Sequence, residues 1–529
     1  MRTAPVAAAV AAISLLAALA LGRGDEAAAQ AQTKPNLVVI LTDDQTLSDL
    51  YERRAHKRQH VMESTLRLLG DEGVSFRRAY ASNPISCPSR STLLTGQHSF
   101  NHRIRANVFP GGEFCSAPGR FELERTLPVW LQASGYRTLH FGRFLNGWGH
   151  FDPYQVPPGW DRWVAPVDTP SSPAALFYGY HLNEDGVLSP MYGEVGHSDP
   201  DNYFTDVITD KAIAALEQGD PAQPFFLALD HRAPHEDLIA PVGPEPALRH
   251  AGTLRRQPAP HPPSFNEPDT SDKAPFLRRS RRMGPRQIRL IGYRNRRRLQ
   301  SLLAVDESVE RIVAVLEELG ELEETYIVFA SDHGFFRGEH RFVKGKRRPY
   351  EPATRIPLLI RGPGIPVGET SGELVANVDI APTLVQLAGA DPTVAMDGRS
   401  LLRYAWRPSR RSRRPILLES YFGRFGTGEY VPVQPQRAPA RSARQPTPKT
   451  WKAIVAGRWK LIRYSKGVYE LYDLKRDPYE LRSLARRRRF APLRRFLATQ
   501  LVRLADCEAR SCRDAMPKPP QPKRVRRRP

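Results

Sequence analysis

The sequence predicts an α/β protein built around a mixed, mainly parallel sheet. Uninterrupted apolar runs at 36–41, 224–229 and 325–330 have the composition of strands that are buried on both faces. Stretches with helical spacing lie between these runs, such as the one from Leu299 to Gly320. Strands that alternate with helices are typical of an α/β sandwich. With 529 residues the chain is also long enough to bury a large core.

Polar and charged residues follow the predicted strands closely. They are Asp43 and Asp44 after 36–41, Arg143 after the strand 136–141, His235 after 224–229, and Asp332 and His333 after 325–330. In open α/β sheets, ligands bind beyond the carboxyl ends of parallel strands. The aspartate oxygens among these residues are hard donors, which suit Ca²⁺ or Mg²⁺ better than a soft metal. The pattern therefore places a candidate ligand site at this edge of the sheet, although adjacent aspartates such as Asp43 and Asp44 also commonly cap turns.

The stretch 82–96, with the sequence SNPISCPSRSTLLTG, predicts a polar turn that leads into a short helix. Pro88 fits the first turn, where a missing N–H costs nothing, and Gly96 fits the end of the helix. This places Ser86 at the helix N-terminus, where backbone N–H groups and the helix dipole favour an anionic neighbour.

The same stretch resembles the signature of the sulfatase family, in which Cys or Ser, any residue, Pro, Ser and Arg are followed by Leu-Thr-Gly. Ser86 holds the key position, because Pro88 directly follows Cys87 and puts that cysteine out of register. Most members start from cysteine, so Ser86 implies either the less common serine type or a site that is never matured. The downstream run 338–351 also resembles the family, and its register selects Lys346 as the catalytic lysine.

Two further stretches resemble family motifs. Ala-Pro-His at 233–235 matches a motif whose histidine binds sulfate or protonates the leaving oxygen, here His235. Gly142-Arg143 matches a second signature in part, since the family has lysine after the glycine. Arginine keeps the charge but replaces a compact ammonium with a planar fork.

The resemblance implies a role for each site residue. The catalytic residues would be Ser86, Arg90, His235, Lys346 and Arg143, and the metal ligands would be Asp43, Asp44, Ser86, Asp332 and His333. The metal, Ca²⁺ or Mg²⁺, would lower the pKa of the nucleophilic hydroxyl and polarise the sulfate oxygens. The basic side chains would neutralise charge that develops on the sulfuryl group and the leaving oxygen.

In this family the key residue is oxidised to formylglycine, whose hydrate is the nucleophile. One hydroxyl of the hydrate attacks sulfur, and the other expels sulfate as the aldehyde re-forms. The sulfate ester of an unmodified Ser86 has no such exit, so we expect little turnover of sulfate esters without oxidation. The implied partners are a formylglycine-generating maturation enzyme and a sulfated small molecule or glycan as substrate.

Residues 1–31 have the pattern of a secretory signal. Arg2 gives a short positive region, 5–21 is an almost continuous apolar run, and Ala29-Gln-Ala31 fits a cleavage site. The run is short and weakly apolar for a membrane span, so we expect cleavage rather than stable membrane insertion. The predicted location is outside the cell or in the cell envelope, where Cys507 and Cys512 fit a small disulfide loop. The state of Cys87 and Cys115 stays open.

The formal net charge is +22. A basic surface suits a polyanionic substrate such as a sulfated glycan, and equally nucleic acid or cell-wall polymers. A codon bias toward Arg, Ala and Pro would also scatter arginines through loops, and the clusters do lie mainly in loops and the tail. We expect no nucleic-acid partner.

The resemblance covers about residues 34–485 and implies an alkaline-phosphatase-like sandwich with a small C-terminal antiparallel-sheet subdomain. Its motifs are closest to N-acetylglucosamine-6-sulfatase-like and arylsulfatase members. The predicted organisation is a signal (1–31), a catalytic domain (32–405) with an irregular basic Pro/Arg-rich insertion (240–292), a C-terminal subdomain (406–506) and a basic tail (507–529). Residues 407–448 are predicted to be irregular.

Three functions fit the sequence. The favoured one is an exported metal-dependent sulfatase that acts on a sulfated sugar or aryl sulfate through formylglycine at Ser86. The second is a phosphodiester or phosphonate hydrolase of the same superfamily that uses unmodified Ser86. The third is a catalytically inactive, polyanion-binding sulfatase-like protein, which Ser86, Arg143 and the charge also suit.

Overall fold

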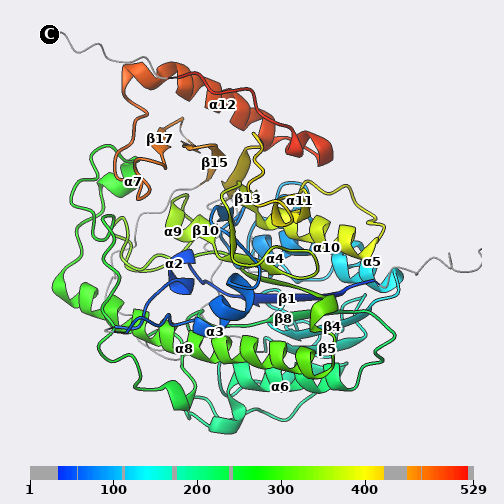
Figure 1. Cartoon of the computed structure of the whole chain (residues 1–529). Coiled ribbons are helices and arrows are strands. Elements are labelled where there is room, and N and C mark those ends of the chain that lie inside the picture. Colours follow the sequence, from blue (N-terminus) through cyan, green and yellow to red (C-terminus); the bar gives the residue numbers. More distant parts are fainter. Residues whose placement is uncertain are drawn as a thin grey trace, which may run out of the picture.

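The computed structural model describes residues 34–55, 57–109, 113–169, 176–237, 242–421, 450–465 and 467–521 (Figure 1). The expected signal at 1–31 lies outside these residues. Among the described helices, none is both long and apolar enough to cross a membrane.

A ten-stranded sheet forms the centre of the molecule, in the order β12-β2-β11-β9-β1-β8-β4-β5-β6-β7. Its strands are β1 Asn36–Thr42, β2 Val74–Phe76, β4 Arg137–Gly142, β5 Arg162–Pro166, β6 Leu182–Glu184, β7 Val187–Leu188, β8 Phe225–Asp230, β9 Thr325–Ser331, β11 Leu358–Arg361 and β12 Glu369–Ser371. The five neighbours from β9 to β5 are parallel, whereas β11 and β6 pair antiparallel with β9 and β5. The predicted mixed, mainly parallel sheet is confirmed.

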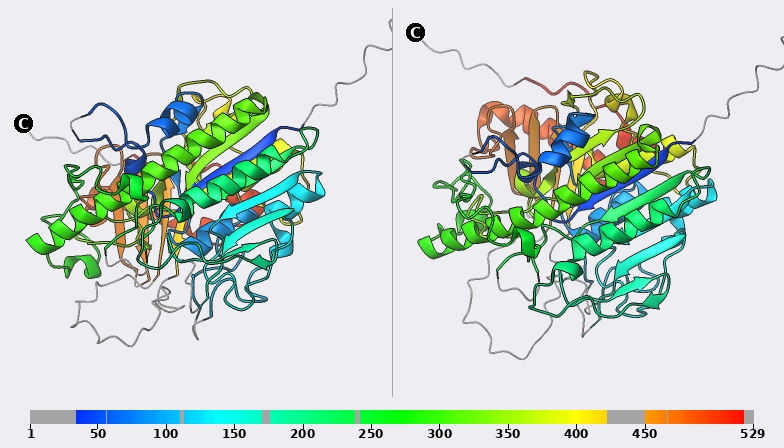
Figure 2. Two further views of the ribbon diagram at one scale, coloured as in Figure 1. Left: turned by 90° about the horizontal axis from the view of Figure 1, so that it is seen from below. Right: turned by 60° about the horizontal axis from the view of Figure 1, so that its bottom comes forward.

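Both faces of this sheet are covered, as the apolar runs predicted. Successive residues of a strand point to opposite faces, so Leu37 and Val39 pack in one apolar cluster and Val38 and Ile40 in another. Helices α5 and α10 contribute to the first cluster, and α6 and α8 contribute to the second (Figure 2). The result is the helix–sheet–helix sandwich that the resemblance implied.

The helices begin and end mostly where capping residues allow. They are α2 Leu47–Leu50, α3 Glu63–Thr65, which continues as a π-helix over Leu66–Gly70, α4 Ser86–Thr95, α5 Leu127–Ala133, α6 Phe204–Glu217, α7 Pro275–Arg278, α8 Pro285–Glu318, α9 Glu351–Thr354, α10 Ile380–Ala388, α11 Leu402–Ala405 and α12 Ala491–Ala505. Helix α8 starts at Pro285, well before the predicted Leu299, because Gln287 bonds back to the N–H of Gly284. The expectation that 240–292 is irregular throughout is therefore wrong for its last turns.

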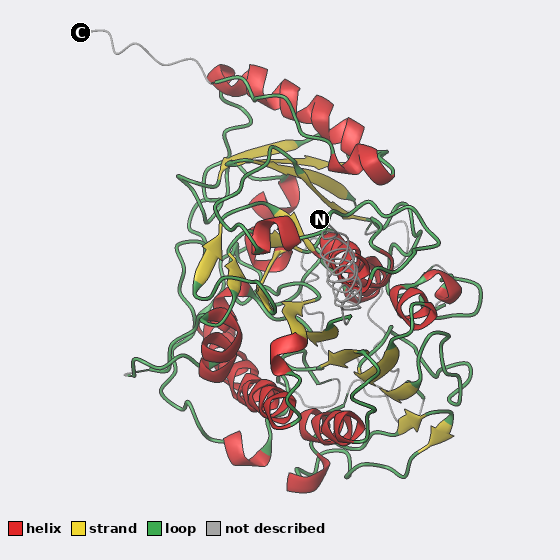
Figure 3. Cartoon of the chain, turned by 45° about the vertical axis from the view of Figure 1, so that its right-hand side comes forward, coloured by secondary structure: helices red, strands yellow, loops and turns green. Residues whose placement is uncertain are grey.

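A four-stranded antiparallel sheet, β14-β15-β16-β17, forms the predicted C-terminal subdomain (Figure 3). Its strands are Ile416–Ser420, Trp451–Ala456, Trp459–Tyr464 and Tyr469–Asp473. One face packs on α12 through Leu493, Leu497 and Leu501, and the other packs on the main domain. Strand β14 lies in a stretch that was predicted to be irregular. Its apolar side chains Ile416 and Leu418 pack in the interface with the main domain.

A small third sheet, β10-β3-β13 (Arg355–Ile356, Ala79–Tyr80 and Val375–Ala376), joins the loop before α4 to the rest of the main domain. Disulfide bonds link Cys87 to Cys115 and Cys507 to Cys512. The predicted C-terminal disulfide loop is thus confirmed, and the open question about Cys87 is answered by its pairing with Cys115.

Candidate active site

The carboxyl ends of four neighbouring strands meet at one edge of the large sheet. Strand β1 leads into Asp43 and Asp44, and β9 leads into Asp332 and His333. These two strands are in register, with Thr42 opposite Ser331, so the four side chains start from adjacent positions. The loops after β8 and β4 add His235 and Arg143 at the same edge. The structure thus brings together the residues that the sequence grouped by strand ends.

Ser86 is the first residue of α4, as predicted, and Gly96 ends that helix with a φ of 65°. The Ser86 side chain is fully buried. Its Oγ lies 3.3 Å from His333 Nε2 and 3.3 Å from Lys346 Nζ. A reactive group at this position therefore has the α4 N-terminus behind it and a lysine beside it.

The carboxylates beside Ser86 are surrounded by fixed positive charge. Arg90 lies one turn further along α4, and its guanidinium nitrogens stand 3.4 Å from Asp43 Oδ2 and 3.4 Å from Asp332 Oδ2. Arg143 also contacts Asp43, and Lys346 Nζ is 3.0 Å from Asp44 Oδ1. The arginine at 143 therefore keeps a place in the site, where the family signature has lysine.

The pKa values of these carboxyl groups move apart. Burial raises the pKa of Asp43, but the positive charges around it, that of Arg143 first, outweigh burial and hold the pKa below its usual range. Asp44 behaves in the same way, with Lys346 as the main opposing charge. The pKa of Asp332 is raised instead, by burial and by the negative charge of Asp43. Crowded carboxylates of this kind are common where proteins bind cations.

The donor set fits a divalent cation. One ligand atom each from Asp43, Asp44 and His333 lies within 4.8 Å of the others. Asp43 Oδ1 is buried without a hydrogen bond or ion pair from any described residue, whereas Asp44 Oδ1 and Asp332 Oδ2 contact side chains of the site itself, namely Lys346, His333 and Arg90. Buried acceptors are normally paired, and a hard cation would satisfy these oxygens. Four of the five predicted ligands are thus carboxylate or imidazole groups, and Ser86 Oγ is the fifth.

His235 stands at the mouth of the site. Its side chain is 18% exposed, and its Nε2 lies 3.8 Å from Asp44 Oδ2. Nδ1 is 2.7 Å from the carbonyl oxygen of Glu236, which only accepts, so Nδ1 carries the proton and Nε2 faces the site. Burial, together with the charges of Lys346 and Arg143, holds the pKa of His235 well below its ordinary value.

Two residues of the site were not among those predicted from the sequence. Asp230 ends β8, and its Oδ2 lies 3.4 Å from Arg90 and 3.5 Å from His140. Arg298 is buried and donates to the carbonyl oxygens of Asp44 (2.7 Å) and Pro234 (3.0 Å). Asp230 could have been identified from the sequence, because it is an acidic residue at the end of a predicted strand. Arg298 had only its spacing of four from Leu302 on the apolar stripe of α8.

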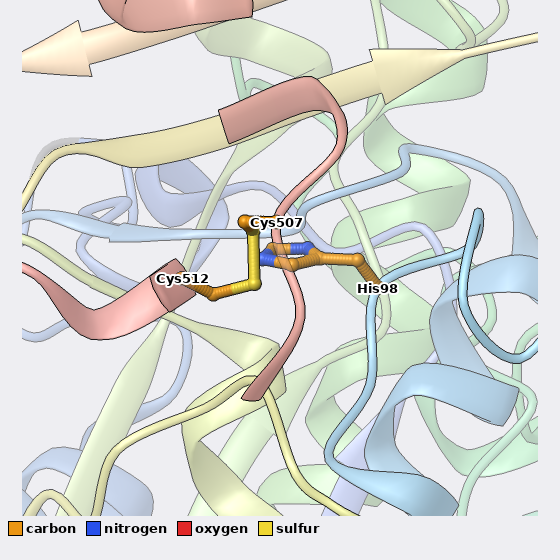
Figure 4. Close-up of side chains that lie close together, drawn as sticks. All are labelled: His98, Cys507 and Cys512. Atoms are coloured by element: carbon orange, nitrogen blue, oxygen red, sulfur yellow. A yellow bond between two sulfur atoms is a disulfide. The ribbon is translucent and has the colours of Figure 1, made fainter. Parts of the chain in front are cut away.

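A second group of metal-binding residue types lies at the other end of α4. His98, Cys507 and Cys512 come together there (Figure 4). The two sulfur atoms form a disulfide bond, so neither offers a thiolate. His98 stacks on Phe100 instead, with ring centroids 5.7 Å apart. This cluster is structural.

Residues 35–390 match the family model described as Sulfatase. The chain belongs to the sulfatase family. Members are sulfuric ester hydrolases, and the residues matched include every predicted site residue. The resemblance that the motifs carried is thereby confirmed.

Named relatives agree with this family. Human N-acetylglucosamine-6-sulfatase is 32% identical over 77% of this chain and 71% of its own length. A putative extracellular sulfatase, a Sulf-1 homolog of Caenorhabditis elegans, is 34% identical over 73% of this chain. The chain spans 51% of the length of that worm protein, and so about half of it. Among solved structures, BT4656 in complex with its substrate D-glucosamine-2-N,6-O-disulfate has a TM-score of 0.68 at 26% identity, over 89% of this chain and 97% of its own.

Proposed function

We propose that the protein is an exported, metal-dependent sulfatase that hydrolyses sulfate esters of sugars through a formylglycine formed from Ser86. One observation carries the proposal. Ser86 Oγ lies 3.3 Å from Lys346 Nζ and 3.3 Å from His333 Nε2, beside three buried carboxylates. The solved complex of BT4656 with a sulfated glucosamine supports a sulfated sugar as substrate.

The residues of the site divide the work by position. Asp43, Asp44, Asp332 and His333, with the oxygen on residue 86, would hold Ca²⁺ or Mg²⁺. Such an ion, when bound, lowers the pKa of a coordinated hydroxyl and withdraws charge from sulfate oxygens. Arg90 contacts both Asp43 and Asp332, so it fixes the direction of two ligands at once. Asp230 and the carbonyl of Arg143 hold Arg90 from its far side.

Lys346 and His235 act on the reacting group itself. Lys346 Nζ lies between Ser86 Oγ and Asp44, where it stabilises negative charge on the attacking oxygen and on the sulfuryl oxygens. His235 Nε2 lies on the most exposed side of the site, where the imidazolium form would give its Nε2 proton to the departing ester oxygen. Arg143 adds a further positive charge on the side of Asp43.

The decisive experiment is the mass of the reduced peptide that contains Ser86 and Cys87, from protein made in its own host. We expect the loss of two hydrogens at position 86, together with turnover of a sulfated sugar that depends on Ca²⁺ or Mg²⁺. Reduction is needed because Cys87 is bonded to Cys115. An unmodified serine with phosphodiester or phosphonate turnover would overturn the proposal in favour of the phosphoryl hydrolase. An unmodified serine without turnover would favour the polyanion-binding protein.

A further inference from the structure

The start of α8 and the segment before it carry concentrated positive charge. Between residues 278 and 298 the chain has ten arginines and no acidic residue. Arg294 and Arg298 lie in ion pairs with Glu236 and Asp49. The other eight have no carboxylate within 4.0 Å among the described residues. We call these eight the arginine ridge: Arg278, Arg279, Arg281, Arg282, Arg286, Arg289, Arg296 and Arg297.

Four members of the ridge lie on α8, namely Arg286, Arg289, Arg296 and Arg297, and the other four lie between the end of α7 and the start of α8. Arg286, Arg289 and Arg296 recur with Tyr293 at helical spacing, and the first two are exposed. The opposite face, with Ile291 and Asn295, is buried. Tyr293 is 44% exposed, and the guanidinium groups of Arg296 and Arg297 each lie 5.9 Å from its ring centre. The N-terminal end of α8 reaches the edge of the molecule (Figure 2).

The ridge shares α8 with two arginines that contact the residues around the candidate active site. Its helix carries Arg298, which holds the backbone of Asp44 and of Pro234, the residue before His235. Arg294 Nε lies 3.5 Å from Glu236, directly after His235. From Arg298 back to Arg286 the helix rises about 18 Å. A polyanion with its reacting group beside Ser86 would therefore extend along α8, past the arginines of this helix.

Among the described residues, no carboxylate compensates the charges of the ridge. Like charges three or four residues apart on a helix destabilise it by about 0.2–0.5 kcal/mol per pair. A polyanion would remove that repulsion, because guanidinium groups bind oxyanions of this type through paired N–H donors. Free charges along a surface also raise the local concentration of an oppositely charged substrate.

We propose that the arginine ridge binds the anionic chain of a polymeric sulfated glycan while one of its sulfate esters lies at Ser86. The assignment rests on the proposed sulfatase function, and it defines the substrate class as a polymer rather than a single sulfated sugar. On this proposal a polymer, which extends beyond the residue at Ser86, gains from these charges more than a monosaccharide does.

The test compares two variants that each remove four positive charges. The ridge variant is Arg281→Gln, Arg282→Gln, Arg286→Gln and Arg289→Gln. The matched control is Arg486→Gln, Arg487→Gln, Arg488→Gln and Arg489→Gln, on exposed residues of the C-terminal subdomain. Binding of heparin is measured over a series of salt concentrations, and kcat/KM is measured for desulfation of heparin and of glucosamine 6-sulfate.

We expect the ridge variant to bind heparin about tenfold more weakly at low salt, with a smaller salt dependence, than the wild type or the control. Its kcat/KM should fall for heparin and stay within about twofold for glucosamine 6-sulfate. Equal losses in both variants would overturn the proposal, since total charge would then explain binding. Equally tight, ridge-dependent binding of duplex DNA would also overturn it, by assigning the ridge to polyanions in general. Ridge-dependent heparin binding without turnover of any sulfate ester would support the ridge and refute the proposed function instead.

Discussion

Two regions of this molecule bury several charged side chains, and they solve the electrostatic problem in different ways. At the interface with the C-terminal sheet, Lys460 of β16 is fully buried between two carboxylates, 3.0 Å from Glu351 and 2.9 Å from Glu480. At the candidate active site, one ligand atom each of Asp43, Asp44 and His333 lies within 4.8 Å of the others, and the cations Arg90 and Lys346 flank the carboxylates. The chain supplies the central cation in the first region, whereas the second has the form of a binding site for one.

The comparison shows that buried charge alone does not identify a functional site. Burial lowers the pKa of Lys460, but Glu480 and Glu351 outweigh it and raise the pKa overall, so the lysine stays charged. The pKa of Asp332 is raised by burial and by the like charge of Asp43, and that of Glu480 beside Lys460 is raised in the same way, by burial and by Glu351. A raised carboxyl pKa therefore does not separate the two regions. They differ in that Lys460 lies between the carboxylates of the interface, whereas those of the candidate site lie around Ser86.

The largest expected effect is on the folding of the interface. Lys460→Met leaves Glu351 and Glu480 buried without their shared cation, so we expect a loss of about 3–5 kcal/mol in the free energy of unfolding. Urea unfolding measures this loss. The control Lys475→Met changes an exposed lysine of the same subdomain and should stay within about 0.5 kcal/mol of the wild type. Equal effects of the two substitutions would mean that the buried pair adds no specific stability.

A substitution at the candidate active site, Asp332→Asn, should have the opposite effect: the free energy of unfolding should be preserved and the activity lost. In Asp332→Asn, the retained Oδ1 still accepts from the N–H groups of Asp44 (3.1 Å) and His333 (2.8 Å), and only the crowded Oδ2 is replaced. We expect turnover of sulfate esters to fall by about 10²- to 10³-fold. Thermal unfolding in the presence of a chelator should show no loss of stability. A variant that keeps more than a tenth of the activity would contradict the role of Asp332.

Metal addition sharpens the comparison further. A cation that binds only the folded protein stabilises it by about 2.7 kcal/mol at a concentration one hundred times its Kd. We therefore expect Ca²⁺ or Mg²⁺ to raise the unfolding temperature of the chelated wild type, and to do so less for Asp332→Asn. Lys460→Met should respond like the wild type, because its change lies outside the donor set. Equal responses of all three proteins would place the cation elsewhere.

The sequence predicted the parts of these two regions that depend on patterns within a short stretch of the chain. Asp43, Asp332 and Ser86 each follow a strand or begin a helix within a recognisable stretch, so both their elements and their meeting were predictable. Register follows from parallel pairing, which puts Thr42 opposite Ser331. Local patterns therefore predicted the large sheet and the candidate site.

Long-range partners were not predictable in the same way. Lys460 looks like one residue of an alternating strand, and nothing near it indicates a carboxylate 109 residues away, at Glu351. The pairing of Cys87 with Cys115 is likewise a product of tertiary structure. Strand β14 was not predicted, because its five residues lie in a Pro/Arg-rich stretch. Such features depend on which surfaces meet, and a single sequence does not contain that information locally.

Some titratable side chains are buried in their neutral form. Of the effects considered, we expect theirs, on the pH dependence of the free energy of unfolding, to be the smallest. Burial lowers the pKa of His98 and of His102 to about 3 and that of His231 to about 4. His102 accepts from the N–H of Ile104 at Nδ1, which leaves Nε2–H to donate to Thr92. This neutral form ties the loop after α4 back to that helix.

These histidines bind protons more readily in the unfolded chain, where their ordinary pKa is about 6.5. Stability should therefore be fully present above about pH 6.5 and decrease as the pH falls toward 4. At about pH 5 each buried histidine contributes a loss of about 2 kcal/mol, since one pKa unit corresponds to about 1.4 kcal/mol. His98→Gln should reduce the difference in unfolding free energy between about pH 7 and about pH 5 by that amount, whatever its effect at pH 7. An unchanged difference would mean that His98 is protonated in the folded protein.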